Sequence, residues 1–319
     1  MELWMPVLLF AVGVAALVWG GDTFVGAASW IAEKTGIPKF VIGATVVSFA
    51  TTLPELIVSL MATLDGSIDM AVGNAIGSVS ANIGLIMGIS LLVLPAKLDD
   101  VSFWAKGAVM IISTAFLGAF VIDGAIGVLE SLVLLTLLFI FLFLNLNSMK
   151  MASMFPDPRQ PRKRPGAGEI FAHLMKFILG LSGILLGADL LVDNGERLAR
   201  MMGVPEALVG LTFVAIGTSL PELITTISAI VRRESSLSVG NIVGANIIDI
   251  TMILASCAFV SEGRLRVSAQ TASLDVPVTL VLMVIAVVPA VLHRRFARWQ
   301  GILLLAVYGG YICHIALTM

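Results

Sequence analysis

Two glutamates stand out in this sequence because each lies inside an otherwise apolar stretch, directly after a proline. Glu55 is preceded by Thr51 and Glu222 by Thr218, at the four-residue spacing that places two side chains on one face of a helix. A proline has no backbone N–H, so it leaves the carbonyl four residues before it without its helical partner. Carboxylate, hydroxyl and carbonyl oxygens are hard ligands, which suit Ca²⁺ or Na⁺ and bind zinc or copper poorly. The repeated arrangement therefore predicts a site for such cations.

The stretch that follows each glutamate carries further polar residues at four-residue spacing. They are Asn74, Ser78 and Asn82 in the first copy, and in the second Asn241 and Asp249 with Ala245 between them. This spacing puts each set on one helical face. Three carboxyl groups around one ion cannot all ionise easily, so we expect Asp249 to carry a proton often while the glutamates hold the ion. Asn74 and Asn241 have an equally good structural interpretation, because an asparagine amide can bond a neighbouring helix.

The composition places most of the chain in a lipid bilayer. Of its 319 residues, 58% are hydrophobic and 13% are charged, with a mean hydropathy of +1.03, whereas a soluble domain is about 25% charged. The net charge of −2 gives no reason to expect a nucleic-acid partner. An ionisable residue at membrane depth is costly and indicates function, which strengthens the interpretation of both glutamates. Segments of membrane-spanning length predict ten helices, at about 4–26, 37–64, 70–95, 103–122, 125–147, 170–193, 204–231, 237–260, 272–292 and 298–317.

A polar segment, 148–169, interrupts this rhythm with four prolines and several basic residues, and is expected to be a cytoplasmic linker. It divides the chain into two five-helix halves, 1–147 and 170–319. A shift of 167 residues aligns Gly20–Ile83 with Gly187–Ile250 without a gap, and about a third of the aligned residues are identical. Repeats with an odd number of spans insert in opposite senses. We therefore expect an all-α membrane protein of two inverted five-helix repeats, with helices broken by Gly and Pro at the ion site.

The positive charges set the expected orientation, because cytoplasmic loops carry most of the Lys and Arg residues of a membrane protein. With the linker in the cytoplasm and ten spans, both termini lie outside. Of the 19 Lys and Arg residues, 15 then fall inside and 4 outside. This asymmetry supports the count of ten.

The glutamate motifs resemble those of a known family. The second copy reads G-T-S-L-P-E from Gly217 to Glu222, the first reads A-T-T-L-P-E from Ala50 to Glu55, and a G-N-x-x-G segment follows each. These doubled motifs resemble the two repeats of the cation/Ca²⁺ exchanger superfamily, in its microbial Na⁺/Ca²⁺ exchanger branch, over nearly the whole chain. The resemblance implies a multi-pass transporter of the prokaryotic inner membrane, not an enzyme. It would exchange Na⁺ for Ca²⁺ electrogenically by alternating access, with the transported ions bound and no other cofactor.

The resemblance also implies a set of ion ligands. Glu55 and Glu222 would ligate both ions, and Asn82 and Asp249 would lie at the middle of the site. The remaining ligands would be Thr51, Thr52, Ser78 and the Ser48 carbonyl in the first half, and Thr218, Ser219 and the Ala215 carbonyl in the second. Two positions depart from the family's pattern: Ala245 replaces a serine and Val79 replaces an asparagine. The loss of the serine removes a hydroxyl ligand and puts the Na⁺ stoichiometry in question.

Other functions remain open on the sequence alone. The nearest is an antiporter with another couple, such as H⁺ for Ca²⁺ or a different divalent cation. A passive cation channel would also need polar groups at membrane depth, although broken helices fit a carrier better. An intramembrane hydrolase could use two carboxyl groups as acid and base. No nucleophile motif and no H-E-x-x-H sequence accompanies them.

Overall fold

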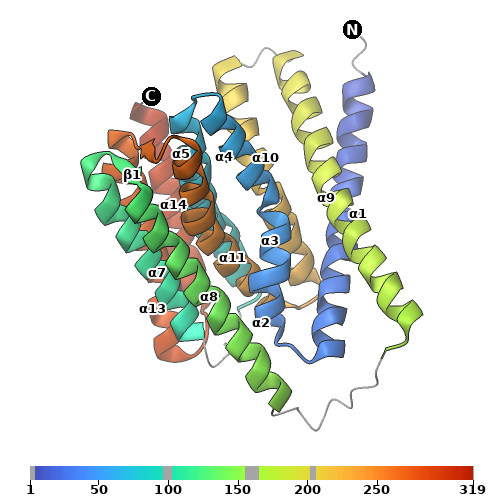
Figure 1. Ribbon diagram of the computed structural model, residues 1–319. Coiled ribbons are helices and arrows are strands. Elements are labelled where there is room, and N and C mark those ends of the chain that lie inside the picture. Colours follow the sequence, from blue (N-terminus) through green and yellow to red (C-terminus); the bar gives the residue numbers. More distant parts are fainter. Residues whose placement is uncertain (1–3, 96–102, 155–164, 202–205, 319) are drawn as a thin grey trace.

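The fold is described by a computed structural model that covers residues 4–95, 103–154, 165–201 and 206–318, without the side chains of residues 153 and 206–216. This part is almost entirely helical (Figure 1). The pattern follows from the composition, because a helix satisfies every backbone polar group internally where no water is present. The helices of the first half are α1 (Trp4–Thr35), α2 (Lys39–Ile42), α3 (Ser48–Thr51), α4 (Leu53–Leu64), α5 (Ile68–Ala81), α6 (Gly88–Val93), α7 (Phe103–Phe120) and α8 (Val128–Met154).

The second half contains α9 (Ala167–Met201), α10 (Glu206–Val231), α11 (Ser235–Ile248), α12 (Leu254–Val260), α13 (Val276–His293) and α14 (Arg298–Thr318). Several helices join through π-helical turns, which are η1 (Gly43–Val47), η2 (Asn82–Met87), η4 (Asp249–Ile253) and η5 (Thr271–Asp275). A short 3₁₀ turn, η3 (Val121–Asp123), leads into the strand β1 (Ala125–Gly127), which pairs antiparallel with β2 (Arg264–Arg266). The pairing ties the two halves together at one end of the molecule.

Nine of the ten predicted spans correspond to a helix or a series of joined helices, although the first two residues of the seventh, 204–231, lie outside the described part. The fifth, 125–147, begins on the strand β1 and continues on α8. Among the described residues, eight helices are long and apolar enough to cross a membrane. The pair Lys39–Thr51 and Leu53–Leu64, bent by 41°, makes a ninth candidate. α10 occupies the seventh predicted range, with its side chains described only from Gly217 onward. The count of ten and the inverted relation of the halves stay predictions.

The predicted break near each glutamate is confirmed in the first half and wrong in the second. Helix α3 ends at Thr51 and α4 begins at Leu53, whereas α10 continues through Pro221. The two turns differ in the partner of one hydroxyl. The Thr52 hydroxyl donates to the Ser48 carbonyl at 2.7 Å, whereas the equivalent Ser219 hydroxyl donates to Ser78 on α5 at 3.5 Å.

The predicted linker is shorter than expected. Helix α8 continues to Met154 and α9 begins at Ala167, so both ends of the 148–169 segment are helical. No glycine or proline lies between Ser148 and Met154 to stop the helix, and the Ser148 hydroxyl donates to the Leu144 carbonyl at 3.1 Å. Residues 155–164 lie outside the described part.

Helices α1 and α9 lie side by side along most of their length (Figure 1). Glycines allow this approach. A Cβ atom at Gly20 would lie 2.7 Å from the Ile184 nitrogen, and one at Gly180 would lie 2.6 Å from the Phe24 nitrogen. Small residues permit such backbone contact in membranes.

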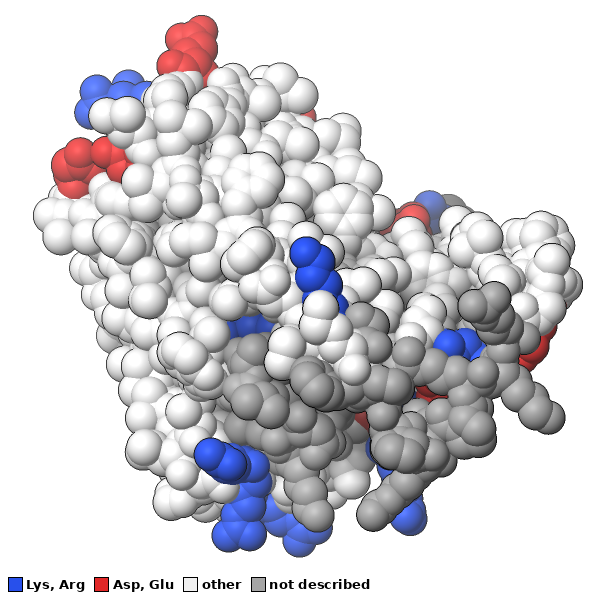
Figure 2. Space-filling view, turned by 60° about the horizontal axis from the view of Figure 1, so that its bottom comes forward, with Lys and Arg blue, Asp and Glu red and all other residues white. Residues whose placement is uncertain are grey.

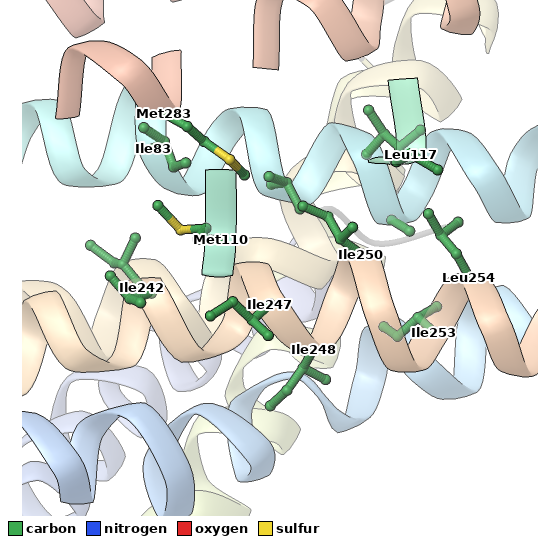
Figure 3. Packing of buried hydrophobic residues seen from close by; sticks show 14 of the residues in the cluster. Ile83, Met110, Leu117, Ile242, Ile247, Ile248, Ile250, Ile253, Leu254 and Met283 are labelled. Atoms are coloured by element: carbon green, nitrogen blue, oxygen red, sulfur yellow. The ribbon is translucent and has the colours of Figure 1, made fainter. Parts of the chain in front are cut away.

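The largest apolar core lies away from α1 and α9, around the helices that carry the predicted ligands Asn82 and Asp249. It contains side chains of α5, α7, α11, α12 and α13, and includes Ile83, Met110, Ile247 and Met283 (Figure 3). These residues surround the turns η2 and η4, so they fix where Asn82 and Asp249 lie.

Candidate ion-binding site

Ten of the eleven residues predicted for the site are buried, each with at most 9% of its surface exposed. Ala215 belongs to the stretch of α10 whose side chains are outside the described part, and its carbonyl stays a prediction. The ten come from both halves: Ser48, Thr51, Thr52 and Glu55 around the α3–α4 break, Ser78 on α5, Asn82 at the start of η2, Thr218, Ser219 and Glu222 on α10, and Asp249 at the start of η4.

Two hydrogen bonds connect the halves symmetrically. The Thr51 hydroxyl donates to Asn241 Oδ1 at 3.3 Å, and the Thr218 hydroxyl donates to Asn74 Oδ1 at 3.3 Å. Thr51 and Thr218 are equivalent in the repeat, and so are Asn74 and Asn241, so the second bond is the counterpart of the first. Helix α11 accordingly packs against α3 of the first half, and α5 packs against α10 of the second. Each threonine is therefore oriented by an asparagine of the opposite half.

The sequence allows two roles for Asn74 and Asn241, ion binding and helix packing. The structure gives both of them a positioning role. The Asn74 amide nitrogen donates to the Glu55 carbonyl at 3.3 Å and to the Ser59 hydroxyl at 3.0 Å. The Asn241 amide nitrogen donates to the Thr225 hydroxyl at 3.1 Å. Both belong to the repeated G-N pattern, which was the available signal. Thr225 carried no such signal, because it aligns with Val58, and Ser59 aligns with Thr226 as a hydroxyl residue of a kind that is common on helix-packing surfaces.

Three buried carboxyl groups lie near one another, although they do not by themselves form a metal-binding cluster among the described residues. Glu55, Glu222 and Asp249 are each 1% exposed and close enough for their charges to interact. Five of their six carboxyl oxygens are buried without a hydrogen-bond partner among the described residues: Glu55 Oε2, both of Glu222 and both of Asp249. Within that same part of the chain, no Lys or Arg forms an ion pair with any of the three. Their charge must be balanced by protons or by bound cations.

Hydroxyl and amide oxygens surround these carboxyl groups. The Thr51 and Thr52 hydroxyls lie close to the Glu222 carboxyl group. The Asn82 side-chain oxygen is also buried without a hydrogen-bond partner in the described part of the chain. No cluster of three or more His, Cys, Asp or Glu side chains suited to a metal ion occurs among the described residues. The available ligands are therefore mixed carboxylate, hydroxyl and amide oxygens, a set that suits Ca²⁺ or Na⁺ rather than zinc.

One predicted ligand is already engaged. The Ser48 carbonyl accepts bonds from the Thr52 backbone and hydroxyl and from the Thr51 hydroxyl, the last at 3.3 Å. To bind an ion, this carbonyl would have to give up at least one of these donors. The Thr51 and Thr52 hydroxyls can rotate toward an ion that the Ser48 carbonyl binds, so these three oxygens can ligate the ion together.

The π-helical turns explain how Asn82 and Asp249 reach the site. η2 begins at Asn82 and η4 begins at Asp249, at positions that the internal repeat makes equivalent. A π-helical turn adds a residue to the helical turn and is frequent at functional sites. Nothing in the residue types predicts it.

Comparison with known proteins places the chain in context. A family model described as sodium/calcium exchanger protein matches residues 5–147 and 173–317. Inner membrane protein YrbG of Escherichia coli is 33% identical over 317 residues, which cover 97% of this chain and 95% of YrbG. Sodium/calcium exchanger MaX1 of Methanosarcina acetivorans is 28% identical, with 96% and 97% covered. A solved structure of the sodium-calcium exchanger NCX_Mj, soaked with Na⁺ and Sr²⁺, is similar with a TM-score of 0.85 and 30% identity, covering 98% of this chain and 99% of that one.

Proposed function

This chain belongs to the sodium/calcium exchanger protein family, and from this premise we propose that it moves Ca²⁺ across the membrane in exchange for Na⁺ by alternating access. The chain is a multi-pass membrane protein and a transporter rather than an enzyme. The observation that carries the proposal is the group of buried carboxyl oxygens of Glu55, Glu222 and Asp249 that have no hydrogen-bond partner among the described residues.

The electrostatics favour cations that enter and leave. Burying unpaired carboxylates costs several kcal/mol each unless a counter-charge arrives. The Glu55 and Glu222 carboxylates balance one Ca²⁺ or two Na⁺, so either load neutralises the site. A ligand set that both ions can use, but not together, is what an exchange cycle requires.

The arrangement of the halves supports a carrier over a channel. Thr51 of one half contacts Asn241 of the other, and Thr218 contacts Asn74, so the ion site lies where the halves meet. Relative movement of the halves would open the site alternately to each side, as in other transporters with repeated halves. We place both termini outside a prokaryotic inner membrane, because the basic residues then fall inside.

The direct test is ⁴⁵Ca²⁺ uptake into sealed proteoliposomes that contain Na⁺ and are diluted into Na⁺-free buffer. We expect uptake that requires internal Na⁺ and is lost in Glu55→Gln and Glu222→Gln. The matched control is Glu262→Gln, which makes the same chemical change on an exposed residue and should transport normally. Uptake that ignores Na⁺ but follows a pH gradient would contradict the proposal in favour of H⁺/Ca²⁺ antiport. Uptake that needs no counter-ion would indicate a channel.

A further inference from the structure

The internal repeat provides two equivalent half-sites, and they differ by one hydroxyl group. We propose that the half-site at Ala245 does not hold Na⁺, so that this transporter exchanges two Na⁺ for one Ca²⁺ and moves no net charge. This inference rests on the proposed function and specifies its stoichiometry, against the electrogenic exchange expected from the resemblance.

The two half-sites can be compared because the internal repeat makes their residues equivalent. The Thr51–Asn241 bond and the Thr218–Asn74 bond are equivalent under the 167-residue shift and have the same length, 3.3 Å. The same shift pairs Thr52 with Ser219, and Ser78 with Ala245. The last pair therefore differs in whether it offers a hydroxyl ligand.

At the half-site of α5, two hydroxyls face each other. Ser219 donates to Ser78 at 3.5 Å, and both are buried. A cation entering between α5 and α10 finds both oxygens there. At the half-site of α11, Ala245 is fully buried and has only a methyl group. The Thr52 hydroxyl, which corresponds to Ser219, turns back to the Ser48 carbonyl at 2.7 Å.

The residue before Ala245 packs closely against the first half. A Cβ atom at Gly244 would lie 2.4 Å from the Ser48 hydroxyl and 2.6 Å from the Ala44 carbonyl oxygen. Helix α11 is thus pressed against η1 and α3 at this level. A buried water that replaced the missing hydroxyl would need two to four polar partners. The Ala245 methyl group provides none of them.

Charge balance points to the same number. The two glutamates are neutralised by one Ca²⁺ or by two Na⁺. A third Na⁺ would need a further set of neutral oxygens, and at the half-site of α11 that set lacks the hydroxyl that Ser78 supplies on α5. When two Na⁺ exchange for one Ca²⁺, the two loaded forms have equal charge.

The test uses the dependence of Ca²⁺ accumulation on membrane potential. Proteoliposomes with a fixed Na⁺ gradient are clamped with a K⁺ gradient and valinomycin, and the ⁴⁵Ca²⁺ distribution is measured at equilibrium. Moving one net charge through 100 mV is worth about 2.3 kcal/mol, or about fiftyfold in the Ca²⁺ ratio. We expect the wild-type ratio to change less than about twofold. A fiftyfold shift in the wild type would overturn the inference and leave Na⁺/Ca²⁺ exchange standing, whereas the absence of any Na⁺-driven accumulation would refute the proposed function itself.

A matched pair of variants then tests the position. Ala245→Ser restores the missing hydroxyl, and we expect it to make the Ca²⁺ ratio depend on potential and to steepen the Na⁺ dependence of transport. Ser78→Ala removes the equivalent hydroxyl of the other half-site. By the same reasoning we expect it to remove one Na⁺ from the cycle, so that one Na⁺ exchanges for one Ca²⁺ and the Ca²⁺ ratio depends on potential with the sign opposite to that of Ala245→Ser. An Ala245→Ser protein that folds and transports, yet stays independent of potential, would contradict the role given to this position.

Discussion

At the scale of single residues, the three buried carboxyl groups dominate the energetics of this protein. Each lies away from water, and the described part of the chain offers Glu222 and Asp249 no hydrogen bond to either carboxyl oxygen. Such a group costs several kcal/mol if it is charged and unpaired. These carboxyl groups therefore lower the stability of the ion-free protein. A cation that binds and neutralises them recovers this free energy.

The first prediction concerns the stability of the ion-free protein. Glu222→Gln keeps the shape of the side chain and removes its charge, so we expect the melting temperature in chelator to rise by about 2–6 °C. Saturating Ca²⁺ should stabilise the wild type, by about 2.7 kcal/mol at a hundredfold excess over Kd, and should not stabilise the variant. Thermal unfolding with and without Ca²⁺ measures both effects. Equal stabilisation of wild type and variant by Ca²⁺ would show that Glu222 is not a ligand.

The second prediction concerns an asparagine with a positioning role. Asn241→Ala removes the hydrogen bonds to Thr51 and Thr225. Two such bonds are worth about 1–2 kcal/mol together, so the Ca²⁺ concentration for half-maximal transport should rise about 5- to 30-fold. The control is Asn145→Ala, because among the described residues the Asn145 amide bonds only the Phe141 carbonyl of its own helix. If both variants change the Ca²⁺ dependence equally, the role assigned to Asn241 is wrong.

At the scale of elements, most of the architecture could be predicted from apolar segment length, since lipid leaves the backbone few alternatives to a helix. The break at Thr52 followed from Pro54. What could not be predicted depends on tertiary contacts. The π-helical turns that begin at Asn82 and Asp249 are one example. Within the first of these turns, a Cβ atom at Gly84 would lie 2.5 Å from the Tyr308 side chain. The continuity of α10 is another, because Pro54 and Pro221 occupy equivalent positions and only Pro54 lies at a helix break.

Most residues of the candidate site stand out because of the repeat, and their role as ion ligands stays a prediction. A carboxyl or amide group that recurs in both halves is unlike a packing residue, because each copy carries the same cost of burial. Glu55 and Glu222 meet this criterion. Asn74 and Asn241 meet it too, but their amides serve equally well as helix-bonding groups. Ser59, which bonds Asn74, gave a weaker signal, because small hydroxyl residues are common on helix-packing surfaces.

The third prediction tests how closely α11 packs on the first half. A Cβ at Gly240 would lie 2.2 Å from the Phe40 carbonyl oxygen, so Gly240→Ala must push two backbones apart. We expect a loss of about 1–3 kcal/mol in stability and at least a tenfold loss of transport, since Asn241 moves with its neighbour. The equivalent Gly73 has no described atom within 4 Å of such a Cβ. Gly73→Ala should therefore be neutral or slightly stabilising, and equal damage by both alanines in thermal unfolding would contradict this account.

At the scale of the whole molecule, charge and topology agree on an orientation. Both ends of the chain lie at one end of the helix bundle, and the facing ends of α8 and α9 lie at the other (Figure 1). Figure 2 brings this second end forward, and Lys and Arg side chains gather on it. They include residues at the helix ends there, such as Lys34, Lys39, Arg232 and Arg294. Since positive charge marks the cytoplasmic side, this end should face the cytoplasm.

The last prediction tests that orientation with two single cysteines in a background free of Cys257 and Cys313. Glu262→Cys places a thiol on the exposed turn between α12 and β2, at the end that carries the termini. Gly166→Cys places one directly before α9, at the basic end. A membrane-impermeant maleimide should label the first in intact cells and the second only after permeabilisation. The reverse pattern would put the termini in the cytoplasm and would leave the basic end outside, against the charge rule. Labelling of both thiols in intact cells would mean that an even number of spans separates them. The predicted arrangement places three spans between them, so it would then be wrong.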